Sequence, residues 1–261
     1  MMLKDKVAFV TGGSSGIGES AARKLAEEGA KVTILARTKE DVQEVADDIE
    51  EQGGDALPLS LDISEPDAVK EAYAKTVEHF GRLDVVLANA GVNGRWAPID
   101  KLEHDDWSST IGINLSGTFY TLKHAVPHLR DSGGGSMIVT SSINGTRTFS
   151  LSGATAYATS KAGQLAMAKM LALELAPDNI RVNVICPGQI ATDIEESTER
   201  DELDQIRYPV EYPEGKVPLR HGEAGHPDEV ADLVVFLASE KSSLITGTPV
   251  WIDGGQSLFM G

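Results

Sequence analysis

Cysteine, aromatic residues, positive charge and long apolar runs are all scarce in this sequence of 261 residues. Cys186 is its only cysteine, which rules out an internal disulfide and fits a reducing compartment, so we expect a cytoplasmic protein. No apolar run approaches the roughly 20 residues that a membrane-spanning helix needs. The chain enters an apolar stretch at Val7 without the positive region, apolar region and cleavage site that make up a signal peptide, so we expect none.

Positive charge is outnumbered by negative charge. Lysine and arginine number 23 against 40 acidic residues, which gives a formal net charge of −17. Binding to a phosphate backbone calls for clustered positive charge, so this balance argues against a nucleic-acid partner. It also disfavours an anionic membrane surface. We therefore expect neither partner and explain the charge by solubility, with a salty cytoplasm as the alternative.

The order of short apolar segments and longer amphipathic segments predicts the fold. Several short segments are almost continuously apolar, as in parallel strands covered on both faces, and apolar residues in the longer ones recur at helical spacing. The expected strands are Val7–Thr11, Lys31–Ala36, Ala56–Leu61, Asp84–Ala88, Ser136–Thr140, Arg181–Ile185 and Pro249–Ile252. The expected helices are Gly18–Gly29, Lys39–Gln52, Glu65–Phe80, Asp105–Leu129, Ala156–Leu175 and Asp228–Ala238. This alternation predicts an α/β, doubly wound three-layer sandwich with a seven-stranded parallel sheet, in a single domain over 1–261.

One segment departs from this alternation. From Asp193 to Glu214 the chain has nine acidic residues, two arginines and few large apolar side chains. The segment follows the sixth expected strand, on the side where ligands of open α/β sheets bind. We expect an exposed, mobile lid over a substrate, at about 193–220.

A glycine-rich turn follows the first expected strand and opens a helix. It reads Thr11-Gly12-Gly13-Ser14-Ser15-Gly16-Ile17-Gly18. A glycine turn can be purely structural, but at the start of a βαβ unit it predicts a dinucleotide site, with the pyrophosphate at the helix N-terminus. The expected cofactor contacts here are Gly12, Ser14, Ser15, Gly16, Ile17 and Gly18.

The end of the second strand bears on the choice of cofactor. NAD sites usually carry an acidic residue here for the ribose hydroxyls, and this chain has Ala36-Arg37 instead. The planar guanidinium of Arg37 suits a 2′-phosphate, so we expect NADP(H) to be preferred, with NAD(H) possible. The alternative is an ordinary solvated arginine, with Glu40 and Asp41 close by.

Polar residues also follow the third and fourth strands. Asp62-Ile63 could receive an adenine amine, and Asn89-Ala90-Gly91 leaves room for a nucleotide sugar. Either segment could instead be turn chemistry, because Asx residues commonly initiate turns.

Candidate catalytic groups lie in the second half of the chain. Tyr157 and Lys161 are four apart on an expected helix and so share one face. A neighbouring ammonium lowers the pKa of a phenol and suits it to proton transfer, although most such pairs are surface pairs. Ser141-Ser142 follows the fifth expected strand, where a hydroxyl could steady a carbonyl oxygen or simply cap a turn. Asn114 lies in an apolar helix, as a satisfied core amide or as the holder of a water.

Together these motifs resemble the short-chain dehydrogenase/reductase family in its compact form, over essentially the whole chain. The resemblance implies that Tyr157 is the acid/base and that Ser142, rather than Ser141, steadies the reacting oxygen. Lys161 would hold the nicotinamide ribose, and Asn114 would position a water that links Lys161 to solvent. The loop after the sixth strand would cradle the nicotinamide, through Pro187, Gly188, Ile190 and Thr192.

The sequence departs from the family pattern at two places. Ala88 precedes Asn89 where the family has a second asparagine, and the gap of 15 positions from Ser142 to Tyr157 is slightly longer than usual. The extra residues lie within 146–154 and should reshape the rim of the substrate site.

The resemblance implies hydride transfer between NADP(H) and a small-molecule carbonyl or secondary alcohol, in a homotetramer built mainly on the helices that hold Asn114 and Tyr157. A 3-oxoacyl-thioester reductase and a glucose-type sugar dehydrogenase remain alternatives within the family, and a non-catalytic dinucleotide sensor is an alternative of another class. His124 and His128 lack a carboxylate at ligand spacing, so we expect no metal site.

Overall fold

A parallel sheet of seven strands forms the centre of the computed structural model, which describes residues 1–206 and 217–259. The strand order is β3-β2-β1-β4-β6-β7-β9, and every neighbouring pair is parallel. The strands are β1 (Val7–Thr11), β2 (Lys31–Ala36), β3 (Asp55–Ser60), β4 (Val85–Ala88), β6 (Gly135–Thr140), β7 (Ile180–Pro187) and β9 (Pro249–Ile252). The predicted doubly wound fold is confirmed, and all seven strands lie where the sequence predicts them, with small shifts at their ends.

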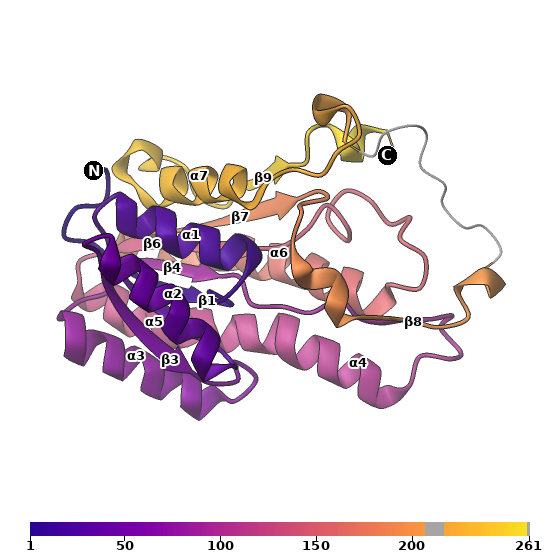
Figure 1. Ribbon diagram of the computed structural model, residues 1–261, viewed down its shortest axis with the longest axis horizontal. Helices are drawn as coiled ribbons and strands as arrows, with labels where there is room; N and C mark the ends of the chain where they lie inside the picture. The colour runs from indigo at the N-terminus through magenta and orange to yellow at the C-terminus, as the bar shows by residue number, and fades with distance from the viewer. Residues whose placement is uncertain (207–216, 260–261) are drawn as a thin grey trace.

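Helices cover both faces of the sheet (Figure 1). The helices are α1 (Gly16–Glu27), α2 (Lys39–Glu51), α3 (Pro66–Phe80), α4 (His104–Ile111), α5 (Thr118–Asp131), α6 (Thr155–Leu175) and α7 (Pro227–Ala238). Residues of α1, α2 and α7 form one buried apolar cluster with the sheet, and residues of α3, α5 and α6 form the other. None of the described helices is long and apolar enough to cross a membrane.

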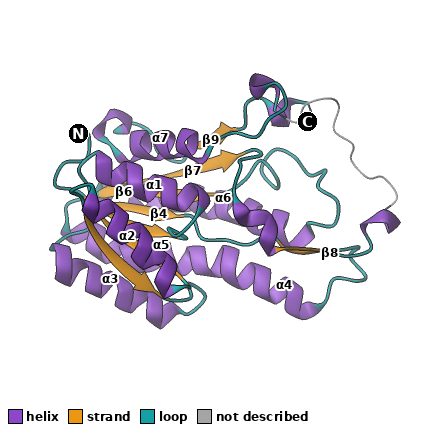
Figure 2. Cartoon of the chain, viewed as in Figure 1, coloured by secondary structure: helices purple, strands orange, loops and turns teal. Residues whose placement is uncertain are grey.

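The topology brings the candidate site residues to one edge of the sheet. β1 pairs with β2 on one side and with β4 on the other, so the strand order reverses beside β1. Because all strands run parallel, their carboxyl ends meet at this edge, and open α/β sheets bind ligands at such a reversal. The loops that follow the strands there are teal in Figure 2.

The prediction of one α-helix over Asp105–Leu129 is wrong, because a π-helix interrupts it. The chain forms α4, then a π-helix, η1 (Gly112–Gly117), and then α5. The wider turn leaves the carbonyl of Asn114 to accept hydrogen bonds from the side chains of Thr118, at 2.7 Å, and Gln164, at 2.7 Å. Apolar spacing continues through this segment, so periodicity alone indicated one helix.

The described part of the predicted lid has more structure than the sequence indicated. After Thr192 come η3 (Asp193–Ser197), strand β8 (Thr198–Arg200) and η4 (Leu203–Gln205). β8 pairs in parallel with β5 (Gly94–Trp96), a second small sheet that the sequence did not predict. Residues 207–216 of the lid lie outside the described residues, and its mobility stays a prediction. The other short helices are η2 (Ala176–Asp178), η5 (Pro218–Arg220), η6 (Glu240–Ser242) and η7 (Gln256–Leu258).

Candidate active site

The glycine loop after β1 turns sharply and packs tightly against its own helix. Gly12 has a φ of +65°, which favours glycine. A Cβ at Gly18 would lie only 1.9 Å from the carbonyl oxygen of Gly12, so helix and loop could not approach this closely with any larger residue. Ser15 precedes α1 in an extended conformation and makes no side-chain cap hydrogen bond. The first N–H groups of α1 therefore remain available to an anion, and the loop fits a pyrophosphate.

The ends of β1 and β4 are joined beneath this loop. The hydroxyl of Thr11 accepts hydrogen bonds from the backbone N–H groups of Asn89, at 3.0 Å, and Ala90, at 3.1 Å. The Asn89 amide donates to the Gly12 carbonyl at 3.2 Å. Asn89 and Ala90 thus lie beside the glycine loop, and their contact with a nucleotide sugar stays a prediction. The role of Thr11 was missed, although a threonine at a strand end before glycine offered a signal.

The residues predicted to contact the adenosine half lie after β2 and β3. Arg37 is exposed, and no carboxylate of the described residues pairs with its guanidinium. One carboxylate oxygen of Asp62 accepts hydrogen bonds from the backbone N–H and the hydroxyl of Ser64, both at 2.8 Å. That oxygen therefore stabilises a turn, which was the alternative to an adenine contact. Ile63 is buried and packs beneath Gly117.

The loop after β7 lies against the glycine loop. Thr192 is so close to Gly16 that a Cβ there would lie 2.9 Å from the threonine methyl. Ile190 bridges to Gly225, and the Gln256 side chain accepts from the backbone N–H of Gln189 at 2.7 Å. The segment from Pro187 to Thr192 is therefore fixed from both sides. The part played by Gln256 carried no signal in the sequence.

Tyr157 and Ser142 meet at the carboxyl edge of the sheet. Both are buried, and the Ser142 side chain hydrogen-bonds the phenol of Tyr157. Ser141 instead donates to the backbone carbonyl of Lys161 at 2.8 Å, so the second serine of the pair faces the phenol. Burial raises the pKa of Tyr157, and the carboxylate of Glu195 raises it further, while the bond from Ser142 lowers it. The expectation of a lowered phenol pKa is therefore wrong, because desolvation outweighs the hydrogen bond from Ser142.

Lys161 lies one helical turn beyond Tyr157. Its ammonium is buried, lies 5.5 Å from the centre of the Tyr157 ring and donates to the carbonyl of Thr140 at 3.0 Å. Burial lowers the pKa of Lys161 from 10.5 to about 8. The helical spacing predicted this shared pocket.

Asn114 joins three parts of the site. Its side chain accepts from the backbone N–H of Val92 at 2.8 Å and donates to the Val92 carbonyl at 2.9 Å and to the Ser160 hydroxyl at 3.1 Å. Gly91 lies against it, since a Cβ there would be 3.1 Å from the asparagine oxygen. Asn114 therefore fixes the segment after β4 to helix α6. Its predicted water stays a prediction.

An apolar cluster completes the pocket around the phenol. Trp96, Ala154 and Tyr157 form it, and Leu151 and Leu203 pack against it. Leu151 and Ala154 belong to the slightly lengthened segment after Ser142, and Leu203 belongs to the lid. The rim of the site thus includes the segment that the sequence indicated, together with Trp96.

The fold and this site define a Rossmann-type oxidoreductase: a doubly wound sheet, an uncapped helix N-terminus after a glycine loop, and a buried serine–tyrosine–lysine cluster beside it. Residues 12–257 match the family model described as enoyl-(acyl carrier protein) reductase. The chain belongs to the short-chain dehydrogenase/reductase family and is an oxidoreductase that acts on alcohol and carbonyl groups.

Curated relatives are similar over their full length. The chain is 37% identical over 255 residues to a 3-oxoacyl-[acyl-carrier-protein] reductase of Thermotoga maritima, covering 98% of this chain and 99% of the relative. It is 33% identical over 261 residues to glucose 1-dehydrogenase 2 of Bacillus subtilis, covering 98% and 96%.

Solved structures share the fold over almost the whole chain. A 3-ketoacyl-ACP reductase from Sinorhizobium meliloti 1021 has a TM-score of 0.92 and 49% identity, covering 97% of this chain and 99% of that one. A short chain dehydrogenase from Burkholderia cenocepacia J2315, in complex with NADP, has a TM-score of 0.85 and 33% identity, covering 98% and 99%. A 3-ketoacyl-(acyl-carrier-protein) reductase from Brucella melitensis, complexed with NADH, has a TM-score of 0.85 and 29% identity, covering 98% and 99%.

Proposed function

We propose that this enzyme uses NADP(H) in preference to NAD(H) to interconvert a neutral ketone and a secondary alcohol. The observation that carries the proposal is the position of the buried Ser142–Tyr157 pair and Lys161 at the same sheet edge as the uncapped N-terminus of α1. The protein would act in the cytoplasm as a single dinucleotide-binding domain, 1–261, with a lid at about 193–220.

The chain's own residues would bind and orient both reactants. The glycine loop would hold the pyrophosphate, Asn89 to Gly91 the nucleotide sugar, and Pro187 to Thr192 the nicotinamide. When bound, the nicotinamide supplies or accepts the hydride. Ser142 would donate a hydrogen bond to the substrate oxygen, and Tyr157 would give that oxygen its proton during reduction or remove it during oxidation.

Lys161 would contribute through its charge. Its ammonium lies 5.5 Å from the Tyr157 ring in a dry pocket, where charges interact more strongly than in water. A positive charge there favours the phenolate that remains after Tyr157 has donated its proton. Burial disfavours that phenolate, and the ammonium would offset part of this cost during proton transfer.

Replacing Tyr157 tests the assignment of the acid. Tyr157→Phe removes the phenolic proton and keeps the ring in its apolar cluster, so turnover should fall about 100- to 10,000-fold while the dissociation constant for the cofactor is unchanged. Steady-state rates and cofactor titration measure the two effects. Tyr120→Phe, on α5, is the matched control. A variant that retains turnover would show that another group supplies the proton.

Arg37 supports the cofactor preference because its guanidinium lacks a described carboxylate partner at the end of β2. Arg37→Ala should weaken NADPH binding by about 10- to 100-fold and leave NADH binding nearly unchanged. Calorimetric titration of both cofactors measures this, with Lys75→Ala on α3 as the control. Equal losses for the two cofactors would contradict the preference.

A second candidate is the reduction of 3-oxoacyl thioesters, which the named activity of the Sinorhizobium and Thermotoga proteins favours. Against it stand the acidic residues beyond β7, where Glu195 is close enough to Tyr157 to raise its pKa. To distinguish these functions, a panel of neutral ketones, secondary alcohols, glucose and acetoacetyl-CoA can be assayed with each cofactor. Nicotinamide absorbance measures turnover. No turnover of any compound would favour the non-catalytic sensor.

A further inference from the structure

Two short strands, far apart in the sequence, form a ribbon beside the phenol. Gly94, Arg95 and Trp96 of β5 pair in parallel with Thr198, Glu199 and Arg200 of β8, and we name this unit the β5–β8 ribbon. Asn93 adds a bond to each of two adjoining residues: its backbone N–H donates to the Ser197 hydroxyl of η3 at 3.0 Å, and its amide donates to the Thr198 hydroxyl of β8 at 2.7 Å. The ribbon therefore attaches the described part of the lid to the segment after β4.

Trp96 presents the apolar side of this ribbon to the active site. Only 6% of its surface is exposed, and it shares a cluster with Tyr157 and Ala154. Its indole N–H donates to the Asn93 carbonyl at 3.2 Å, and the Arg200 guanidinium lies 4.9 Å from the ring centre. Leu203 closes the cluster from the lid side. The indole is thus held in one orientation beside the reacting phenol.

The segment after Ser142 also packs against this cluster. The backbone N–H of Ala97 donates to the Gly153 carbonyl at 3.2 Å. A Cβ at Gly153 would lie 2.5 Å from a Leu203 methyl and 2.8 Å from the Ala97 nitrogen, so three segments of the chain converge at this glycine. Since a larger residue there would displace Leu203 or Ala97, the relative positions of these segments are fixed.

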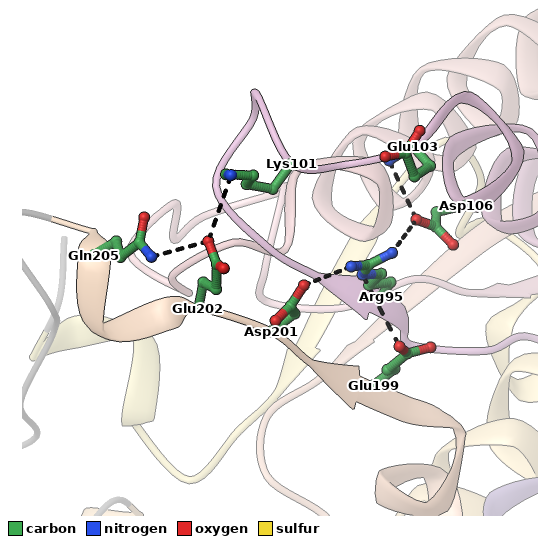
Figure 3. Close-up of polar contacts among 8 residues, drawn as sticks. All are labelled: Arg95, Lys101, Glu103, Asp106, Glu199, Asp201, Glu202 and Gln205. Atoms are coloured by element: carbon green, nitrogen blue, oxygen red, sulfur yellow. Dashed lines mark hydrogen bonds and ion pairs between the residues drawn. The ribbon is translucent and has the colours of Figure 1, made fainter.

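Arg95 lies on the opposite side of the ribbon among carboxylates (Figure 3). Its guanidinium lies 3.1 Å from Asp106 of α4, 2.5 Å from Asp201 and 4.0 Å from Glu199. Only 22% of the Arg95 side chain is exposed. One cation therefore holds together acidic residues from α4 and from the lid, which would repel one another without it.

We propose that the β5–β8 ribbon is the substrate-recognition wall of the site, with Trp96 contacting the apolar body of an uncharged alicyclic or long-chain ketone. Arg95 is a positioning residue, because it holds the ribbon, and hence Trp96, beside Tyr157. The inference rests on the proposed function and names its substrate class. Next to the proton donor, an apolar surface makes substrate binding more favourable with each methylene that it buries. The acidic rim disfavours an anionic substrate.

Shortening Trp96 tests the contact. With wild-type enzyme, kcat/KM should be at least about tenfold higher for cyclohexanone than for acetone, because the larger body buries more apolar surface. In Trp96→Ala this ratio should fall to about threefold or less, mainly through KM for cyclohexanone, and Trp96→Phe should retain most of it. An equal loss for both ketones would overturn the contact with substrate.

Neutralising Arg95 tests the positioning role. Arg95→Gln should raise KM for cyclohexanone about tenfold with little change in kcat, since it leaves Asp106, Asp201 and Glu199 to repel one another. Adding Asp106→Asn and Asp201→Asn to that variant should restore KM, and so should 1 M NaCl, which screens charge beyond about 3 Å. Arg130→Gln, which breaks the exposed pair with Asp178, is the matched control. A defect that neither charge removal nor salt repairs would assign Arg95 a purely structural role and overturn the proposal.

A binding measurement separates this inference from the proposed function. Calorimetric titration of cyclohexanol into the protein with NADP⁺ needs no turnover. If no ketone is reduced but cyclohexanol binds to wild type and about tenfold more weakly to Trp96→Ala, the proposed function fails and the recognition wall stands. If ketones are reduced but cyclohexanol binds equally to both proteins, the function stands and the wall is overturned.

Discussion

Lys161 illustrates how a single residue of the site opposes stability. The residue is 4% exposed, and its ammonium makes one hydrogen bond, to the Thr140 carbonyl, among the described residues. Burial lowers the pKa of Lys161 to about 8, whereas the unfolded chain would titrate near 10.5. Between about pH 8 and 10.5 the unfolded state thus binds more protons, so this residue makes the free energy of unfolding rise with pH in that window. Below pH 8 its buried charge is a constant cost.

Lys161→Met should therefore raise the free energy of unfolding of the cofactor-free protein at pH 7 by on the order of 1–3 kcal/mol, while abolishing turnover. It should also remove the lysine's contribution to the rise between about pH 8 and 10.5. Urea unfolding at several pH values measures both effects as differences from the wild type. Lys169→Met, an exposed lysine of the same helix, should change stability by less than about 0.5 kcal/mol. A destabilised Lys161→Met would mean that the ammonium stabilises the fold.

The sequence predicted which residues lie together at the sheet edge, but not their electrostatics. The spacing of Tyr157 and Lys161 placed both on one helical face, and the structure places them in one pocket. The sign of the Tyr157 pKa shift depends on how completely α6 and the ribbon exclude water, and Trp96 and Leu203 come from segments that no local pattern links to α6. The direction of the Tyr157 pKa shift could therefore not be predicted from the sequence, because it depends on burial by distant segments.

At the scale of elements, the long strands were predicted and the irregular segments were missed. β1 and β7 are buried and mostly apolar, so composition alone indicates them. β5 and β8 have three residues each and contain charged side chains, and their pairing depends on a partner distant in the sequence. The π-helix η1 was missed because its apolar spacing continues that of α4.

The close approach of loop and helix at Gly18 yields a prediction at the same scale. Gly18→Ala would place a methyl 1.9 Å from the Gly12 carbonyl oxygen and 2.6 Å from the Asn89 amide, so the glycine loop must open. We expect affinity for nicotinamide dinucleotides to fall at least about 100-fold and the melting temperature to fall by several degrees. Fluorescence titration and thermal unfolding measure these effects. Ser20→Ala, on the partly exposed side of α1 where the serine hydroxyl donates to Asp228, should leave affinity unchanged, and a Gly18→Ala protein that binds normally would contradict the tight packing.

At the scale of the whole molecule, three exposed apolar side chains lie on α5 and α6, two helices that cover the same face of the sheet. Met170 and Leu173 of α6 are 74% and 82% exposed, and Phe119 of α5 is 44% exposed. The described helix α6 is apolar on both sides, unlike a helix with one face in water. A second copy of the chain would cover such a surface, which supports the proposed homotetramer built on the helices that carry Asn114 and Tyr157.

Leu173→Glu should therefore break the assembly. Sedimentation of the wild type should give four times the chain mass of 27.8 kDa, and the variant should give smaller species, because a carboxylate would be buried in the interface. Ile99→Glu, an exposed apolar position on the loop before α4, is the matched control. A wild-type protein that sediments as a monomer would exclude the tetramer.

The pairing of Gly94 with Thr198 has a consequence for how the protein is made. During synthesis the glycine loop and β4 leave the ribosome well before the second half of the ribbon exists. Contacts of large sequence separation form late, because closing a long loop costs entropy before any pairing compensates it. We thus expect the β5–β8 ribbon, which would distinguish one ketone from another, to form only after the glycine loop and β4 have folded.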